Sequence, residues 1–303
     1  MKSQNTTISI GMPVHNGGDH LYEALKSIVS QTYKNLEIII SDDNSDDDSR
    51  EIIESFKKKD KRIKVFYQKQ NLGSLPNFNF VLKKASGSYF MWAAQDDVRD
   101  ARCVEKLYDL MTEHPDAVLS VSNYKNRYKK TTYFVYPETP YDNDSSHLDS
   151  LIFFIKTYNI PFFYGLYKTD VLKKTGGYHT DNRWFYNGSD FLSIYKVLLK
   201  GRFVRTSEVL FYKRDTGHFT DQRSILRNKQ LDRVVLLKIL RYLTLPLYFT
   251  IDLFLCLYLL LSAPFSWIDK LYIKLILIFR YLLNIKTFIS NIMRGVMQLL
   301  HLK

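Results

Sequence analysis

Two kinds of apolar pattern alternate along the first 124 residues of the chain. Thr7–Val14 is short and rich in β-branched residues, which is typical of a strand, whereas Leu21–Ser30 places its apolar residues on one helical face. The alternation predicts further strands at Leu36–Ser41, Ile63–Tyr67, Ser88–Ala94 and Ala117–Ser122, and helices at Arg50–Lys59, Asn77–Ala85 and Ala101–His114. Strands that alternate with helices predict βαβ units, and therefore an α/β domain with a parallel sheet.

Polar clusters follow three of these predicted strands at the point where each strand ends. The clusters are Pro13–Asn16, Asp42–Asn44 and Asp96–Asp97. Because open α/β sheets bind ligands at the carboxyl ends of their strands, the three clusters predict a binding site at that edge.

The regular alternation fades after Tyr124. A helix is predicted at Leu151–Thr157, and the aromatic segment Pro161–Tyr167 is interpreted as core packing. Further along, Asp190 opens a stretch whose apolar residues recur with helical spacing. An Asp at this place is first of all a helix-capping residue, and a chemical role has to be weighed against that interpretation.

The C-terminal region has a different composition. Leu243–Phe265 has about the length of a membrane-spanning helix but contains Asp252, and Leu271–Lys303 is apolar with scattered cations that do not share one helical face. The preceding run Arg202–Arg241 is rich in Arg and Lys, which fits a surface facing anionic lipid. The sequence therefore predicts a membrane-associated helical region, with buried core helices as the alternative.

The net charge and the two cysteines bear on the class of binding partner and on the cellular compartment. A net charge of +12 over 303 residues favours an anionic partner. Nucleic acid is the weaker choice, because the aromatic residues gather in apolar segments and the predicted sheet edge is acidic. Cys103 and Cys256 lie in very different surroundings, so a reducing compartment is expected. The N-terminus shows no apolar signal segment, which favours a cytoplasmic location.

The acidic run Ser41–Asp48 contains several side-chain oxygens, as a calcium-binding loop does, but it fits such a loop poorly. A register that starts at Asp43 places Glu54 at position 12 but puts Asp48 where the sharp turn requires glycine. The later carboxylates suit the start of a helix. Asp42 and Asp43 remain as candidates to accept hydrogen bonds from a ligand.

At this point the ordered motifs carry a resemblance to a family. MPVHN, IIISDDNSDD, QNLGSLPNFN, ASGSYFMWAAQDD and NGSD follow one another as in the family 2 glycosyltransferases, which have the GT-A fold. The resemblance extends from Thr6 to Gly217. It implies an inverting enzyme that moves a hexosyl or hexosaminyl group from a nucleotide-diphospho-sugar, most simply a UDP-sugar, to a glycan hydroxyl with the help of Mn²⁺ or Mg²⁺.

The resemblance also assigns roles to residues. Asp190 is implied as the catalytic base, Asp97 as the direct metal ligand and Asp96 as its support. The implied nucleotide contacts are Pro13, His15, Asn16, Asp43, Asn71 and Gly73. In the basic tract YKRDTGHFTDQR, His218 is a candidate third metal ligand, and Arg214 and Arg223 are candidates to neutralise phosphate charge.

Two positions depart from the family pattern. Gln95 stands where many members have the first Asp of the DxD motif, and NGSD leaves only Asp190 to act as the base. Two alternatives stay open. One is a catalytically inactive membrane scaffold of the same fold. The other is a sugar nucleotidyltransferase, although GMPVHNGG lacks the glycine-rich loop which that class requires.

The resulting expectation is a GT-A catalytic domain over residues 1–217, a basic linker over 218–242 and hydrophobic membrane-associated helices over 243–303. The C-terminal region suggests a glycan acceptor linked to polyprenyl diphosphate, at the cytoplasmic face of the inner membrane, in bacterial surface polysaccharide synthesis.

Overall fold

The computed structural model describes residues 6–126, 141–157, 162–178, 189–214, 253–254 and 256–282. The chain divides into two compact units, one formed by residues 1–151 and 157–216 and the other by residues 152–156 and 217–303. The two units are considered separately below.

The first unit begins with the predicted alternation of strands and helices. Its elements are β1 (Ile8–Val14), α1 (Gly18–Val29), β2 (Leu36–Asp42), α2 (Ser49–Lys57), β3 (Ile63–Tyr67), α3 (Ser74–Lys84) and β4 (Tyr89–Trp92). The four strands run parallel in the order β3-β2-β1-β4. Because the order turns back at β1, β1 and β4 enclose a switch point at their carboxyl ends, where α/β sheets bind ligands.

The remainder of this unit completes an eight-stranded sheet in the order β3-β2-β1-β4-β7-β6-β8-β5. The added elements are β5 (Val98–Arg99), α4 (Cys103–Glu113), β6 (Ala117–Asn126), α5 (His147–Thr157), β7 (Leu166–Lys168), α6 (Thr169–Lys174), α7 (Ser189–Leu198) and β8 (Arg202–Lys213). β7 pairs antiparallel with β4 and β6, and β5 pairs antiparallel with β8, so the sheet is mixed.

One sequence-based interpretation is wrong at its N-terminal end. The first twelve residues of the basic run Arg202–Arg241 form β8 inside the sheet, and Arg202 is buried against Asp116. The rest of that run lies outside the described residues. The aromatic segment, in contrast, packs as predicted, because Phe162, Phe163 and Tyr167 are buried.

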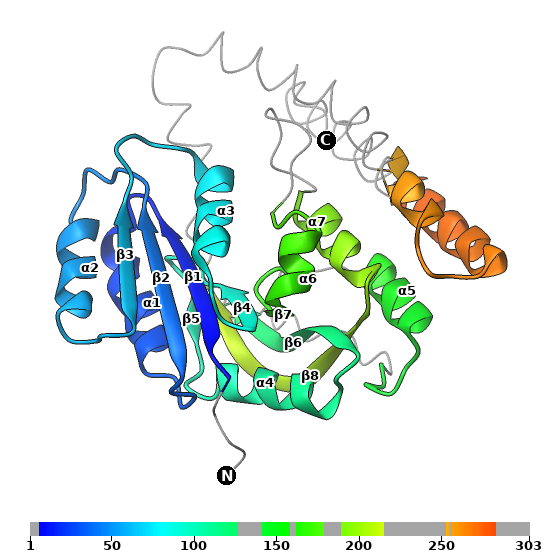
Figure 1. Ribbon diagram of the computed structural model, residues 1–303, viewed down its shortest axis with the longest axis horizontal. Helices are drawn as coiled ribbons and strands as arrows, with labels where there is room; N and C mark the ends of the chain where they lie inside the picture. The colour runs from blue at the N-terminus through cyan, green and yellow to red at the C-terminus, as the bar shows by residue number, and fades with distance from the viewer. Residues whose placement is uncertain are drawn as a thin grey trace, which may run out of the picture. The chain divides into compact units, whose positions relative to one another are not determined.

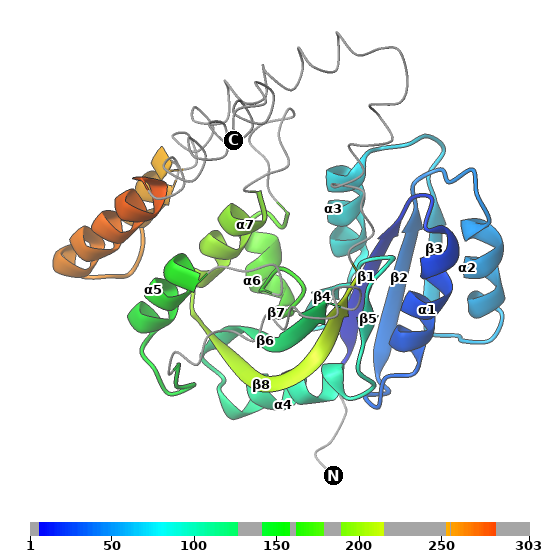
Figure 2. The same cartoon turned by 180° about the vertical axis from the view of Figure 1, so that it is seen from behind.

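Helices cover both faces of the sheet. Figures 1 and 2 view the molecule from opposite sides, and they show α1 and α2 over one face of β1–β3 and α3 over the other. The side chains of Ile8, Ile10, Met12 and Val14 join α1 in one buried core. On the opposite face, a Cβ atom at Gly11 would lie 2.7 Å from Val81 of α3, so glycine allows that helix to approach β1 closely.

Besides residues 152–156, which are part of α5, the second unit contains described helical residues at 253–254, 256–261 and 267–282. Ser266 caps the longer helix, since its hydroxyl accepts a hydrogen bond from the Asp269 amide at 3.2 Å. Among the described residues, no helix combines the length and the apolar character needed to cross a bilayer. Part of the predicted span Leu243–Phe265 lies outside the described residues.

Candidate active site

The loop after β1 is fastened to its neighbours through its backbone. The four successive amides of residues 15–18 each donate a hydrogen bond to a side chain, at 2.8 to 3.0 Å, and the acceptors are Gln95, Ser45, Ser49 and Asp47 in that order. Asn16 takes a positive φ of 49° here, a conformation that asparagine tolerates better than most residues. The side chains of His15 and Asn16 remain exposed at the sheet edge.

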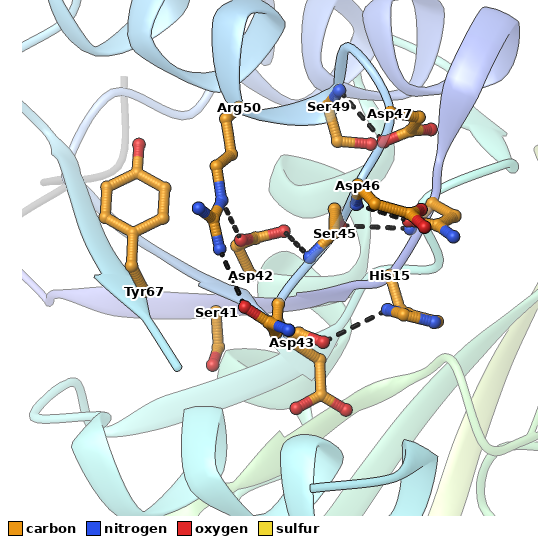
Figure 3. A network of polar contacts seen from close by, with 12 residues as sticks. His15, Ser41, Asp42, Asp43, Ser45, Asp46, Asp47, Ser49, Arg50 and Tyr67 are labelled. Atoms are coloured by element: carbon orange, nitrogen blue, oxygen red, sulfur yellow. Dashed lines mark hydrogen bonds and ion pairs between the residues drawn. The ribbon is translucent and has the colours of Figure 1, made fainter. Parts of the chain in front are cut away.

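Asp42 and Asp43 serve different elements, because consecutive strand residues point to opposite faces. Figure 3 shows their carboxylates pointing in opposite directions, with Asp42 toward Arg50. Asp42 is fully buried; its Oδ2 accepts from Arg50 Nε at 2.8 Å and its Oδ1 from the Ser45 amide at 3.3 Å. The ring of Tyr67 lies under the Arg50 guanidinium, 5.6 Å from the ring centroid. Asp42 therefore stabilises the turn that leads into α2.

Asp43 instead fastens the start of α3. Its two carboxylate oxygens accept hydrogen bonds from the backbone amides of Leu72 at 2.7 Å and Gly73 at 2.9 Å. Gly73 has a φ of 87°, which glycine adopts without strain. Each carboxylate oxygen can accept a second hydrogen bond, so a ligand contact by Asp43 is compatible with this anchoring role.

Asn71 and His15 meet across the edge of the sheet. Asn71 Nδ2 lies 3.1 Å from His15 Nε2, and His15 Nδ1 lies 3.1 Å from the Asp43 carbonyl oxygen. Four of the predicted nucleotide contacts, His15, Asn16, Asp43 and Asn71, therefore come from one connected hydrogen-bond network together with Gly73. Pro13 lies within β1, in register with Ser41 of β2.

Asp97 has the surroundings of a ligand-binding carboxylate. It is 4% exposed, its Oδ1 accepts from the Arg214 amide at 2.7 Å, and its Oδ2 is buried with no hydrogen-bond partner among the described residues. Burial raises the pKa of Asp97 to about 6, with nearby Lys213 opposing the shift and Asp96 adding to it. A buried carboxylate oxygen without a donor is costly unless a cation approaches it.

These residues fit a divalent cation. Asp97 Oδ2 offers a hard anionic oxygen that no described residue satisfies, and Asp96 is half-buried beside it. Magnesium is usually held by one or two carboxylates together with substrate phosphates rather than by a full cage of side chains. Within the described ranges, no group of three or more His, Cys, Asp or Glu residues forms a metal site, and His218 lies outside those ranges.

Asp190 lies in the first turn of α7, as predicted for the start of this helix, and it is half-buried. Burial raises the pKa of Asp190, while a hydrogen bond from the Tyr178 hydroxyl and the charge of Lys213 act in the opposite direction. A carboxylate with a raised pKa accepts a proton more readily than an exposed one, as a general base must.

Tyr164 connects the two reactive carboxylates. It is half-buried near Asp97 and Asp190, and after desolvation these two charges are the main reasons why the pKa of its hydroxyl lies well above the ordinary value. The structure therefore brings the end of β4 and the start of α7 into one site, although more than ninety residues separate them in the sequence. Sequence reasoning missed Tyr164, Tyr178 and Lys213. Tyr164 lay in a segment interpreted as core and Lys213 in the basic run, and no role was assigned to Tyr178.

Arg214 has a different role from the one expected. Its guanidinium bonds to Glu23 and to His20 of α1, and the side chain is 4% exposed. It connects the end of β8 to α1 and holds Asp97 through its backbone amide. Arg223 lies outside the described residues.

Comparisons with known proteins agree with this arrangement. The model of the family described as "Glycosyl transferase family 2" matches residues 9–176. Among curated proteins, glycosyltransferase GlyG of Streptococcus pneumoniae is 36% identical over 119 residues, which are 39% of this chain and 39% of GlyG. Glycosyltransferase GlyA of the same species is 32% identical over 167 residues, 55% of this chain and 22% of GlyA. The chain thus spans less than half the length of these relatives.

Solved structures show the same fold. TarS 1–349 of S. aureus, in complex with UDP-GlcNAc, superposes with a TM-score of 0.70 at 18% identity, over 91% of this chain and 72% of that one. The mannosyltransferase PcManGT of Pyrobaculum calidifontis, in complex with GDP-Man and Mn²⁺, gives 0.52 at 16% identity, over 68% and 56%. The sheet and helices described above therefore form a GT-A fold.

Proposed function

Because the chain belongs to glycosyl transferase family 2, we propose that it transfers a sugar from a nucleotide-diphospho-sugar to a hydroxyl group, with inversion at the anomeric carbon. The observation that carries the proposal is the convergence of Asp97 and Asp190 around Tyr164. Asp97 is suited to bind a cation and Asp190 is suited to accept a proton. Both lie at the edge of the sheet that carries the hydrogen-bond network of His15, Asp43 and Asn71, called the nucleotide-side network below.

In this mechanism Asp190 removes the proton from the acceptor hydroxyl as that oxygen attacks the anomeric carbon. The bond from the anomeric carbon to the diphosphate oxygen breaks at the same time, and the nucleoside diphosphate leaves. A single displacement of this kind inverts the anomeric centre. Tyr178, which hydrogen-bonds to the Asp190 carboxylate, keeps the base oriented.

Mn²⁺ or Mg²⁺ would be held by Asp97, with Asp96 in support. When bound, the cation offsets the negative charge that develops on the leaving diphosphate. The nucleotide would lie against His15, Asn16, Asp43, Asn71 and Gly73, whose positions the network already fixes. A UDP-sugar is the first choice, supported by the UDP-GlcNAc complex of TarS, which shares the fold.

The acceptor is proposed to be a lipid-linked glycan used for bacterial surface polysaccharide, reached at the cytoplasmic face of the membrane. The support comes from the second unit, which exposes many large apolar side chains: Phe254, Tyr258, Leu261, Trp267, Ile268, Leu271, Tyr272, Leu275, Phe279 and Leu282. On the longer helix the exposed positions 268, 271, 275, 279 and 282 follow one stripe, while Ile273 and Leu277 are buried. Such a stripe suits the interface of a bilayer.

This membrane contact can be tested with vesicles. Leu271→Glu and Leu275→Glu together should abolish co-sedimentation of the full chain with vesicles of phosphatidylglycerol and phosphatidylethanolamine. Tyr22, which is 52% exposed on α1, supplies the control variant Tyr22→Glu. Equal sedimentation of both variants would contradict the proposed contact.

The enzymatic proposal is tested by a hydrolysis screen. The purified chain is incubated with UDP-, GDP- and dTDP-sugars, each with Mn²⁺ or Mg²⁺, and release of the nucleoside diphosphate is measured. Release from one nucleotide sugar that depends on both the cation and Asp190 is the expected result. No release with any of them, together with no nucleotide binding, would favour the inactive scaffold.

A further inference from the structure

Gln95 directly precedes Asp96 and Asp97, and both ends of its side-chain amide form hydrogen bonds with the loop after β1. Gln95 Oε1 accepts a hydrogen bond from the His15 amide at 2.8 Å, and Gln95 Nε2 donates to the His15 carbonyl oxygen at 3.0 Å. The side-chain amide therefore pairs with one residue of the loop after β1 as a neighbouring strand would.

The paired residue is the centre of the nucleotide-side network. Asn71 Oδ1 accepts from the Gly73 amide at 2.7 Å, which leaves Asn71 Nδ2 as the donor toward His15 Nε2. His15 Nε2 must then be an acceptor, so the ring is neutral and its Nδ1–H donates to the Asp43 carbonyl oxygen. Gln95 thus holds the backbone of His15. The two ring nitrogens of His15 form hydrogen bonds with Asp43, which follows β2, and with Asn71, which precedes α3.

This contact requires a glutamine. The two hydrogen bonds to His15 need one donor and one acceptor at the end of a side chain as long as glutamine. An ionised carboxylate can only accept hydrogen bonds. Glutamate would place an anionic oxygen about 3 Å from the His15 carbonyl oxygen. Aspartate would be one methylene group too short to reach both atoms.

We propose that Gln95 is a positioning residue that fixes the nucleotide-contact loop relative to the metal-binding end of β4, and that it takes no part in metal ligation. This inference rests on the proposed function for its ligand, a nucleoside diphosphate. The side-chain amide of Gln95 thus connects two loops that lie 80 residues apart in the sequence.

The test compares Gln95→Glu and Gln95→Met with the control Gln68→Glu. Gln68 lies at the end of β3 and donates to the Ser41 hydroxyl, so its substitution adds the same charge to the same edge of the sheet without touching the loop after β1. Far-UV circular dichroism and urea unfolding establish that each variant is folded. Gln95→Met keeps the side-chain volume but offers neither a donor nor an acceptor of comparable strength.

The first measurement uses no ligand. Hydrogen exchange at the amides of residues 15–18 should accelerate in both Gln95 variants and stay at the wild-type rate in Gln68→Glu. The second measurement is calorimetric binding of UDP, GDP and CDP with Mn²⁺. The nucleotide that the wild type binds should bind each Gln95 variant about tenfold more weakly, the loss of roughly one hydrogen bond. In turnover, KM for the nucleotide sugar should rise more than kcat falls.

A third variant separates positioning from ligation. Gln95→Asp adds a third carboxylate directly before Asp96 and Asp97, and it should bind Mn²⁺ no more tightly than the wild type does. Tighter Mn²⁺ binding by Gln95→Asp, or wild-type exchange rates in Gln95→Glu, would overturn the inference. If exchange accelerates but the wild type binds no nucleotide, the proposed function fails while the loop contact of Gln95 stands.

Discussion

Asp43 and Asp97 are almost equally buried at the same edge of the sheet, with exposures of 1% and 4%, yet the fold treats them differently. Both oxygens of Asp43 accept backbone amides at the start of α3. Asp97 has one such contact, and within the described part of the chain its second oxygen has none. Burial consequently raises the pKa of Asp97 to about 6.

The comparison separates two tasks within one site. On the nucleotide side, the carboxylates contribute to the fold and hold the loops before any ligand arrives. On the reactive side, Asp97 and Asp190 are held in surroundings that disfavour their charged forms. A bound cation would offset the charge of Asp97, and a proton taken from the acceptor would neutralise Asp190. Catalytic groups are commonly held in surroundings that shift their pKa values in this way.

The largest effect is expected at Asp190. Asp190→Asn keeps the size of the side chain and its ability to cap α7 but removes the base, so kcat should fall by ~10²–10⁴-fold with nucleotide affinity unchanged. Single-turnover kinetics and calorimetric binding of UDP with Mn²⁺ measure the two quantities. Asp170→Asn, at the exposed first turn of α6, is the control and should keep full activity. Unchanged turnover in Asp190→Asn would remove Asp190 from the mechanism.

At Asp97 the same substitution should improve the fold while it abolishes function. Asp97→Asn removes a buried charge that the protein leaves half-satisfied, so the free energy of unfolding at pH 7.5 should rise by up to about 3 kcal/mol. Mn²⁺-dependent binding of UDP should disappear. Urea unfolding in EDTA and calorimetry give the two results, and a variant that is both less stable and still binds Mn²⁺ would contradict the assignment.

Asp43→Asn should change stability in the opposite direction. An asparagine turns an NH₂ group toward the amide of Leu72 or Gly73, so one backbone donor loses its acceptor. The expected cost is about 1–3 kcal/mol of unfolding free energy. If Asp43→Asn were as stable as the wild type in urea, Asp43 would not anchor α3.

The smallest effect concerns the hydroxyl of Tyr178. Burial raises the pKa of Asp190 and the hydrogen bond from Tyr178 lowers it, so Tyr178→Phe should raise that pKa further. The acidic limb of the kcat profile should move to higher pH, and activity should recover under alkaline conditions. Tyr167→Phe is the control, since that hydroxyl donates to the carbonyl of Phe162 at 2.7 Å. A loss of activity that is equal at every pH would indicate a purely structural role for Tyr178.

The sequence predicted the βαβ half of the fold well because its signals are local. β3 has the predicted limits, and most other elements differ by a few residues, as at β4, where pairing with β1 ends at Trp92. The antiparallel strand β7 and the strand β8, which runs parallel to β6, were missed. Both lie between polar or aromatic stretches, and only their partners β4 and β6 make them strands.

In the candidate site, too, some features could be predicted from the sequence and others depend on tertiary contacts. The resemblance supplied the carboxylates in their order along the chain, but their environments depend on tertiary contacts. No local pattern indicates that Gln95 pairs with the backbone of His15, or that Lys213 of β8 lies near both Asp97 and Asp190. The contacts of Gln95 with His15 and of Lys213 with Asp97 join segments 80 or more residues apart, so periodicity does not reveal them.

The central claim is that the charge of Asp97 serves a ligand rather than the fold, and one measurement tests it directly. The free energy of unfolding of the wild type and of Asp97→Asn is determined in urea and EDTA from pH 4 to pH 8. Because the folded pKa of about 6 lies above that of the unfolded chain, the folded wild type binds the proton more tightly and loses stability as the pH rises through this window. The two proteins should therefore be similar near pH 4, with Asp97→Asn becoming the more stable one above pH 6. A wild type that gains stability over Asp97→Asn as the pH rises would show that the fold itself uses the charge, and would contradict the account.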